Sequence, residues 1–185
     1  MKGIIFTNFL ELVEDKLGLH IVDEIIKESN LESEGVYTSV GIYEFSEMLQ
    51  LLQNLSNKTN LSEDELLLIY GEHMFSVLTE EHPYIIEAYD DPIDFLSSIE
   101  NHIHVEVRKI YPDAELPSFE VLKRTQGHLS MLYRSSRAMH HFGLGLMNKT
   151  FEHFNVKAHI ELEKIKPDGT EVKFVIDKLN ESTAN

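Results

Sequence analysis

The sequence of 185 residues contains no cysteine. Disulfide bonds, catalysis by a thiolate, and zinc or iron-sulfur centres held by cysteine are therefore excluded. A chain without cysteine fits a reducing compartment, and we expect a cytoplasmic location.

Basic side chains are scarce, with 16 lysines and arginines against 32 acidic residues and a formal net charge of −16. Nucleic acids and anionic membranes would be repelled by such a chain at long range, so neither is an expected partner. No segment approaches the roughly 18 uninterrupted apolar residues of a membrane span. The apolar start at residues 3–6 is interrupted too early by polar and acidic side chains to form a secretion signal.

Apolar residues make up 42 % of the chain, enough to bury a core. We expect one domain over residues 1–178 and a polar tail over residues 179–185.

Apolar residues recur at helical spacing through the N-terminal two thirds of the chain. Ser62 and Glu65 form a capping box before a leucine run, the clearest helix start in the sequence. Asp91-Pro92 marks another start, because proline suits the first helical turn. The predicted helices cover residues 3–18, 21–29, 43–55, 62–78 and 91–111.

From Pro117 onward the apolar period changes from helical to alternating. Strands are predicted at residues 118–124, 128–135, 156–162 and 172–176. A helix at residues 138–154 interrupts them. The expected fold class is α+β, with a helical N-terminal part followed by an antiparallel sheet of about four strands with one inserted helix.

The second predicted strand carries an unusual sequence of side chains on one face. Alternation places Leu129, Met131, Tyr133, Ser135 and Arg137 on the same side. Buried donors of this kind need acceptors, and a bound carboxylate ligand would supply them. Alternatively, the strand leaves the core near Tyr133 and the last two side chains lie in water, which spacing alone favours.

Several histidines and two glycines are candidate functional positions. His102 and His104 lie roughly 200° apart on a helix, which disfavours a shared metal site, and spacing does not decide which one faces inward. The neighbours His140 and His141 could bind a metal, although solvation is the simpler expectation.

Gly143 and Gly145 lie inside a predicted helix, where each costs about 1 kcal/mol relative to alanine. Close approach of another helix, or of a flat ligand, would explain them, and so would ordinary packing.

The order of these motifs resembles the H-NOX family, the heme nitric oxide/oxygen binding domains related to the heme domain of soluble guanylate cyclase. The resemblance rests on His104, Tyr111-Pro112, Pro117-Ser118-Phe119 and the triplet Tyr133-x-Ser135-x-Arg137. It extends from Met1 to about Ile176.

The resemblance implies a heme b buried between the helical part and the sheet. His104, and not His102, matches the proximal iron ligand. The heme propionates would be held by Tyr133, Ser135 and Arg137. The positions that match porphyrin contacts are Ile5, Pro117 and Leu146.

The resemblance also implies which gases bind. Oxygen-binding members use a distal tyrosine that donates a hydrogen bond to dioxygen, and Phe142 stands at the matching position. Phe9 and Met74 complete the expected distal pocket. Bound dioxygen depends on such a donor more than nitric oxide does, so we expect binding of nitric oxide and carbon monoxide and exclusion of oxygen.

The chain would act as a sensor and not as an enzyme. Release of His104 after nitric oxide binding would move its helix, and the signal would pass to a separate protein, in bacterial relatives a histidine kinase or a cyclic-di-GMP enzyme. A heme peroxidase or oxygenase would need an acid-base residue beside Phe142, and none is obvious. The other alternative is a binding module without heme, in which the triplet holds another anionic hydrophobic ligand such as a fatty acid or bile pigment.

Overall fold

The computed structural model describes residues 1–179, so nearly all of the predicted polar tail lies outside the described residues. The fold is mixed α+β, as predicted. The elements are α1 Gly3–Leu17, α2 Leu19–Lys27, α3 Phe45–Thr59, α4 Glu63–Glu81, α5 Pro83–Ile86, α6 Pro92–Ser97, the π-helical turn η1 Ile99–Ile103, α7 His104–Ile110, β1 Ser118–Arg124, β2 His128–Arg134, α8 His140–His153, β3 Ala158–Lys164 and β4 Glu171–Lys178.

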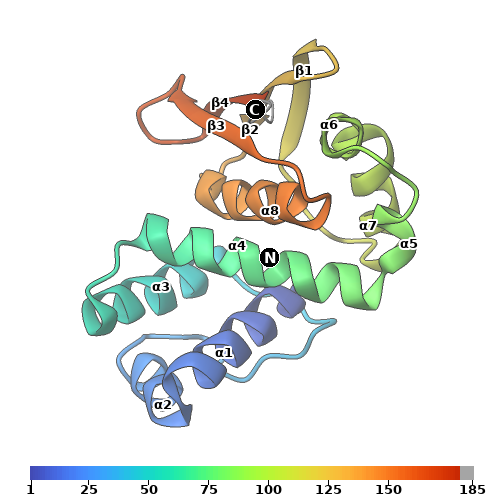
Figure 1. The fold of residues 1–185 in the computed structure, drawn as a ribbon. Helices are drawn as coiled ribbons and strands as arrows, with labels where there is room; N and C mark the ends of the chain where they lie inside the picture. The colour runs from blue at the N-terminus through green and yellow to red at the C-terminus, as the bar shows by residue number, and fades with distance from the viewer. Residues whose placement is uncertain (180–185) are drawn as a thin grey trace.

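The molecule is layered, with the sheet on one side, α8 beneath it, then α4, and α1 to α3 farthest from the sheet (Figure 1). The predicted capping box starts α4: the backbone N–H of Glu65 donates to Ser62 Oγ at 3.2 Å, and that of Ser62 donates to Glu65 Oε2 at 2.8 Å. This helix continues to Glu81, beyond the predicted end at Leu78, because His82-Pro83 is the first segment that stops it.

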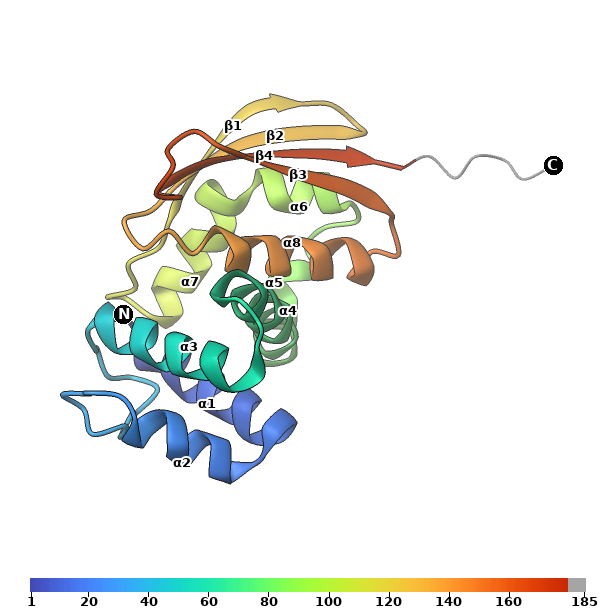
Figure 2. The same cartoon turned by 90° about the vertical axis from the view of Figure 1, so that its left-hand side faces the viewer.

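The sheet is antiparallel in the order β1-β2-β4-β3. Leu129, Met131 and Tyr133 of β2 are buried beside Phe174 and Ile176 of β4. Helices α6 and α8 lie on this inner face (Figure 2). In contrast, β1 is an exposed edge strand with a register shift between Val121 and Lys123.

Helices α4 and α8 share the most extensive contact between any two described elements. Glycines make the close approach possible: a Cβ at Gly71 would overlap the carbonyl oxygen of Phe142, and one at Gly145 would overlap that of Leu68. Gly143 differs, since a Cβ there would be 3.8 Å from Phe174 and make ordinary contact.

The prediction of one helix over residues 91–111 is wrong. Three pieces replace it, α6, η1 and α7, and the carbonyl of Ser98 accepts from both His102 N at 2.8 Å and Ile103 N at 3.3 Å. The second bond has π-helical spacing, which inserts one residue into the helical repeat just before His104. The short helix α5 was not predicted either. None of the helices over residues 1–179 is long and apolar enough to cross a membrane.

Candidate functional site

A cavity of about 280 Å³ lies between the helical part and the sheet. Its wall is mostly apolar and comes from residues spread between Met1 and Thr150. The polar part of the wall includes His104, Tyr133, Ser135, Arg137 and Glu115. An apolar cavity with a few polar groups in its wall suits a hydrophobic ligand that carries anionic groups.

His104 is the first residue of α7 and is 8 % exposed. Its Nδ1 lies 3.1 Å from Glu100 Oε1 on η1, and the same oxygen accepts from the backbone N–H of Phe119 at 2.8 Å. Glu100 therefore ties the histidine to the start of β1. Its spacing of four residues from His104 was a usable signal, and we did not predict its role.

Burial lowers the pKa of His104, although the Glu100 carboxylate opposes the shift. The ring is therefore neutral at pH 7, with Nδ1–H donating to Glu100 and the lone pair on Nε2 available to a metal. His102 differs: its Nδ1 lies 2.6 Å from Tyr89 Oη, and its ring is not part of the cavity wall.

The triplet Tyr133, Ser135 and Arg137 lines the cavity, but not by the predicted alternation. Strand β2 ends at Arg134, so the last two residues lie in the turn that follows it. Burial raises the pKa of the Tyr133 phenol, which keeps it a proton donor at pH 7.

The Arg137 guanidinium has an acceptor in the chain. It donates to the backbone carbonyl of Glu115 at 3.0 Å and forms an ion pair with the Glu115 carboxylate. Its side chain is only 16 % exposed, so the expectation that it lies in water is wrong. Sequence spacing gave no indication of Glu115.

Five of the six other predicted positions line the cavity. They are Ile5, Pro117, Leu146, Met74 and Phe142.

Phe9 does not line the cavity. Its buried ring packs edge-on against Tyr70, with centroids 5.4 Å apart, and Tyr70 in turn contacts Phe142 at 5.2 Å. The Tyr70 hydroxyl donates to the carbonyl of Ile5 at 2.5 Å, so this tyrosine beside the cavity already uses its donor.

Residues 2–162 match the family HNOB, described as Haem-NO-binding. The chain belongs to this family. H-NOX members are heme-binding gas-sensor domains that are generally not catalytic themselves.

Solved H-NOX structures agree with this assignment. The Fe(II) unliganded H-NOX protein from K. algicida is 68 % identical, with a TM-score of 0.96 and full coverage of both chains. The H-NOX from Shewanella woodyi, bound to IWP-051 in the Fe(II)CO state, is 36 % identical, with a TM-score of 0.82 over 100 % of this chain and 98 % of that one. An H-NOX from S. oneidensis in the Fe(II)NO state is 25 % identical, with a TM-score of 0.87 over 97 % of this chain and 100 % of that one.

Proposed function

We propose that this H-NOX chain is a gas sensor that binds nitric oxide and carbon monoxide at a ferrous heme b, excludes oxygen, and signals to a separate protein. The observation that carries the proposal is the buried His104 on the wall of an apolar cavity, with its Nδ1 held by Glu100. When bound, heme would supply the iron to which gases bind.

The residues present fit that cofactor. His104 Nε2 would hold the iron, because Nδ1 is already committed to Glu100. Tyr133, Ser135 and Arg137 supply a phenol, a hydroxyl and a guanidinium for the propionates. A propionate would share Arg137 with Glu115 or replace that carboxylate. Ile5, Pro117 and Leu146 would contact the porphyrin.

The gas-binding side offers nitric oxide an apolar wall. Phe142 and Met74 carry no hydrogen-bond donor, and Phe9 supports them from behind through Tyr70. Bound dioxygen carries partial negative charge and would go unstabilised beside Phe142, which is the basis of the proposed exclusion of oxygen.

Signalling would begin at His104. If this side chain leaves the iron, α7 loses its tether to the cofactor but keeps the Glu100 link to Phe119. Helix α7 and the start of β1 would then move together, which is a discrete change that a partner could recognise. We propose a histidine kinase or a cyclic-di-GMP enzyme as that partner, by resemblance to bacterial members of the family.

An absorption spectrum of the purified, reduced protein tests the proposal. We expect one broad Soret band of five-coordinate ferrous heme under nitrogen, a five-coordinate nitrosyl after nitric oxide is added, and no stable complex in air. A Soret band that never forms, even with added heme, would favour the module for another anionic ligand.

Two variants test the roles of His104 and Phe142 separately. His104→Ala should give a ferrous spectrum unlike wild type until imidazole is supplied, and Phe142→Tyr should gain an oxygen complex. An unchanged ferrous spectrum of His104→Ala would contradict the ligand assignment, and a stable oxygen complex of the wild type would contradict the role of Phe142.

A further inference from the structure

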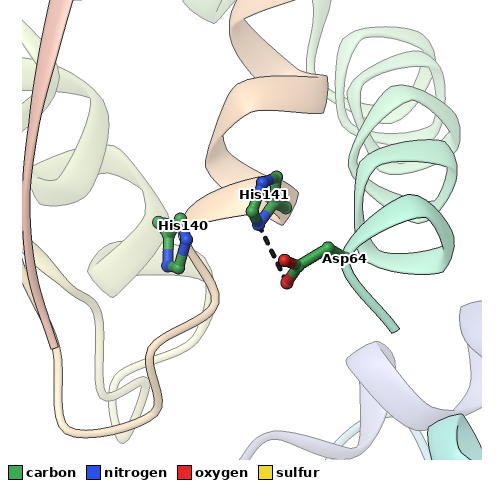
Figure 3. Close-up of side chains that lie close together, drawn as sticks. All are labelled: Asp64, His140 and His141. Atoms are coloured by element: carbon green, nitrogen blue, oxygen red, sulfur yellow. Dashed lines mark ion pairs between the residues drawn. The ribbon is translucent and has the colours of Figure 1, made fainter. Parts of the chain in front are cut away.

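Three potential metal ligands gather where α4 and α8 begin, outside the cavity wall (Figure 3). Asp64 lies in the first turn of α4, and His140 and His141 are the first two residues of α8. Each side chain offers one ligand atom, and these atoms all lie within 4.8 Å of one another.

The burial of His140 distinguishes this group from an ordinary cluster of surface side chains. The residue is 3 % exposed, so the expectation of solvation is wrong for this ring. Its Nδ1 lies 3.0 Å from the carbonyl of Ala138, which makes Nδ1 the protonated nitrogen. Its Nε2 is buried and has no hydrogen-bond partner within residues 1–179. A bare lone pair of this kind is costly to bury unless a ligand uses it.

His141 and Asp64 supply the other two positions. His141 Nδ1 lies 3.0 Å from Asp64 Oδ1, at ion-pair distance but without hydrogen-bond alignment. Ligands about 2.1 Å from a tetrahedral zinc are roughly 3.4 Å from each other, so this spacing is already close to what zinc requires. The Asp64 side chain is 55 % exposed and can move to close the remaining gap.

We propose that Asp64, His140 and His141 form a zinc site, with the fourth position open to water. Two imidazole nitrogens and one carboxylate oxygen favour Zn²⁺ over Ca²⁺ or Mg²⁺, which take oxygen ligands. The positive ends of the α4 and α8 dipoles oppose a cation here. Glu63, Asp64 and Glu65 in the first turn of α4 offset them.

The site would join α4 to α8 one residue before Phe142. Bound zinc would therefore fix the start of the helix that carries Phe142 into the cavity. This inference concerns a second site and does not depend on which gas the cavity binds.

Calorimetric titration of the chelator-treated, heme-loaded protein with zinc chloride tests the proposal. We expect one zinc per chain with micromolar or tighter affinity, and zinc-edge X-ray absorption should show nitrogen and oxygen ligands at about 2.0–2.2 Å. Asp64→Asn and His141→Gln should each weaken binding by at least about tenfold. Neither substitution disturbs the buried His140, so both variants should fold.

His159→Gln is the matched control, because it removes a surface histidine whose ion pair within residues 1–179 is with Glu161 on β3. It should bind zinc as the wild type does. The proposal is overturned if the wild type binds no zinc. It is equally overturned if Asp64→Asn and His141→Gln keep wild-type affinity, since other surface histidines would then hold the metal.

Discussion

At the scale of single residues, Glu100 joins two elements through one oxygen atom. Its Oε1 faces both His104 Nδ1 and the backbone N–H of Phe119. A carboxylate behind a ligating histidine fixes the ring orientation and raises the basicity of the ligand. The strength of the iron–histidine bond should therefore depend on the charge of Glu100.

Glu100→Gln tests this dependence. The amide keeps an oxygen acceptor and removes the charge, so the affinity of the His104 imidazole for iron should fall by about tenfold. The iron–histidine stretching frequency of the ferrous protein should decrease. Glu106→Gln is the control, since Glu106 pairs with Lys109 on the same helix and should leave that frequency unchanged. Equal frequencies in all three proteins would show that Glu100 does not act through the histidine.

Glu47 is a buried carboxylate, and we expect its role to be in stability. It is 4 % exposed and accepts from the Ser33 backbone N–H at 3.1 Å, from Ser33 Oγ at 2.5 Å and from Tyr37 Oη at 2.6 Å. Burial raises the pKa of Glu47, but the hydrogen bonds from Ser33 and Tyr37 outweigh it and lower the pKa overall. The charged form is thus favoured in the folded state.

The lowered pKa of Glu47 in the folded state predicts how stability depends on pH. The stabilisation from Glu47 is complete above its unfolded pKa of about 4.3 and is lost as the pH falls through the lower folded value. Glu47→Gln should cost about 2 kcal/mol at pH 7 and flatten the loss of stability below about pH 4.3. Urea unfolding at several pH values measures both effects, and parallel curves for the two proteins would contradict the assignment.

At the scale of elements, hydrophobic periodicity in the sequence predicted most of the helices and strands. The helices before residue 82, the four strands and α8 agree with their predicted ranges to within a few residues. The π turn η1 was missed because a turn of five residues is too short to show a period of its own. Helix α5 was missed because four residues are too few to show a period.

The candidate site divides in the same way. Strand alternation drew attention to the Tyr133 triplet, and the family resemblance selected His104 over His102; the structure places these residues on one cavity wall. Glu100 could have been found from its spacing of four residues before His104, whereas the contact of Glu115 with Arg137 has no such signal in the sequence. Phe9 was placed in the pocket by resemblance, and its ring lies one layer behind, against Tyr70.

Gly71 lies where α4 crosses α8 at close distance. Gly71→Ala would place a methyl group on the carbonyl oxygen of Phe142, so α8 must shift and carry Phe142 with it. We expect a loss of about 1–3 kcal/mol in stability and a changed carbon monoxide stretching frequency in the heme-loaded protein.

Gly127→Ala is the control for this change, since a Cβ there meets nothing within 4 Å. It should leave the carbon monoxide stretching frequency as in the wild type. A Gly71→Ala protein with wild-type stability and frequency would show that the two helices can separate without moving the pocket.

At the scale of the whole molecule, two hydrophobic cores flank the cavity. One lies among α1 to α4 and includes Phe6 and Met74, and the other lies between the sheet and α8 and includes Phe174. Leu146 packs against both cores. A ligand in the cavity would therefore add to the contact that Leu146 already makes between the two cores.

Heme should accordingly stabilise the entire fold. At free heme about 1,000-fold above its Kd, the gain should be about 4 kcal/mol. Thermal unfolding of the heme-free and heme-loaded protein measures it, with His104→Ala expected to show a smaller gain. No change in Tm after heme addition would contradict a cofactor between the cores.

The span of the cavity wall also has a consequence for biosynthesis. Its residues run from Met1 to Thr150, so the pocket is incomplete until α8 has left the ribosome. The core among α1 to α4 can assemble earlier from residues before 82. Heme can thus bind only in the final stage of folding, when α8 packs against the helical part that formed earlier.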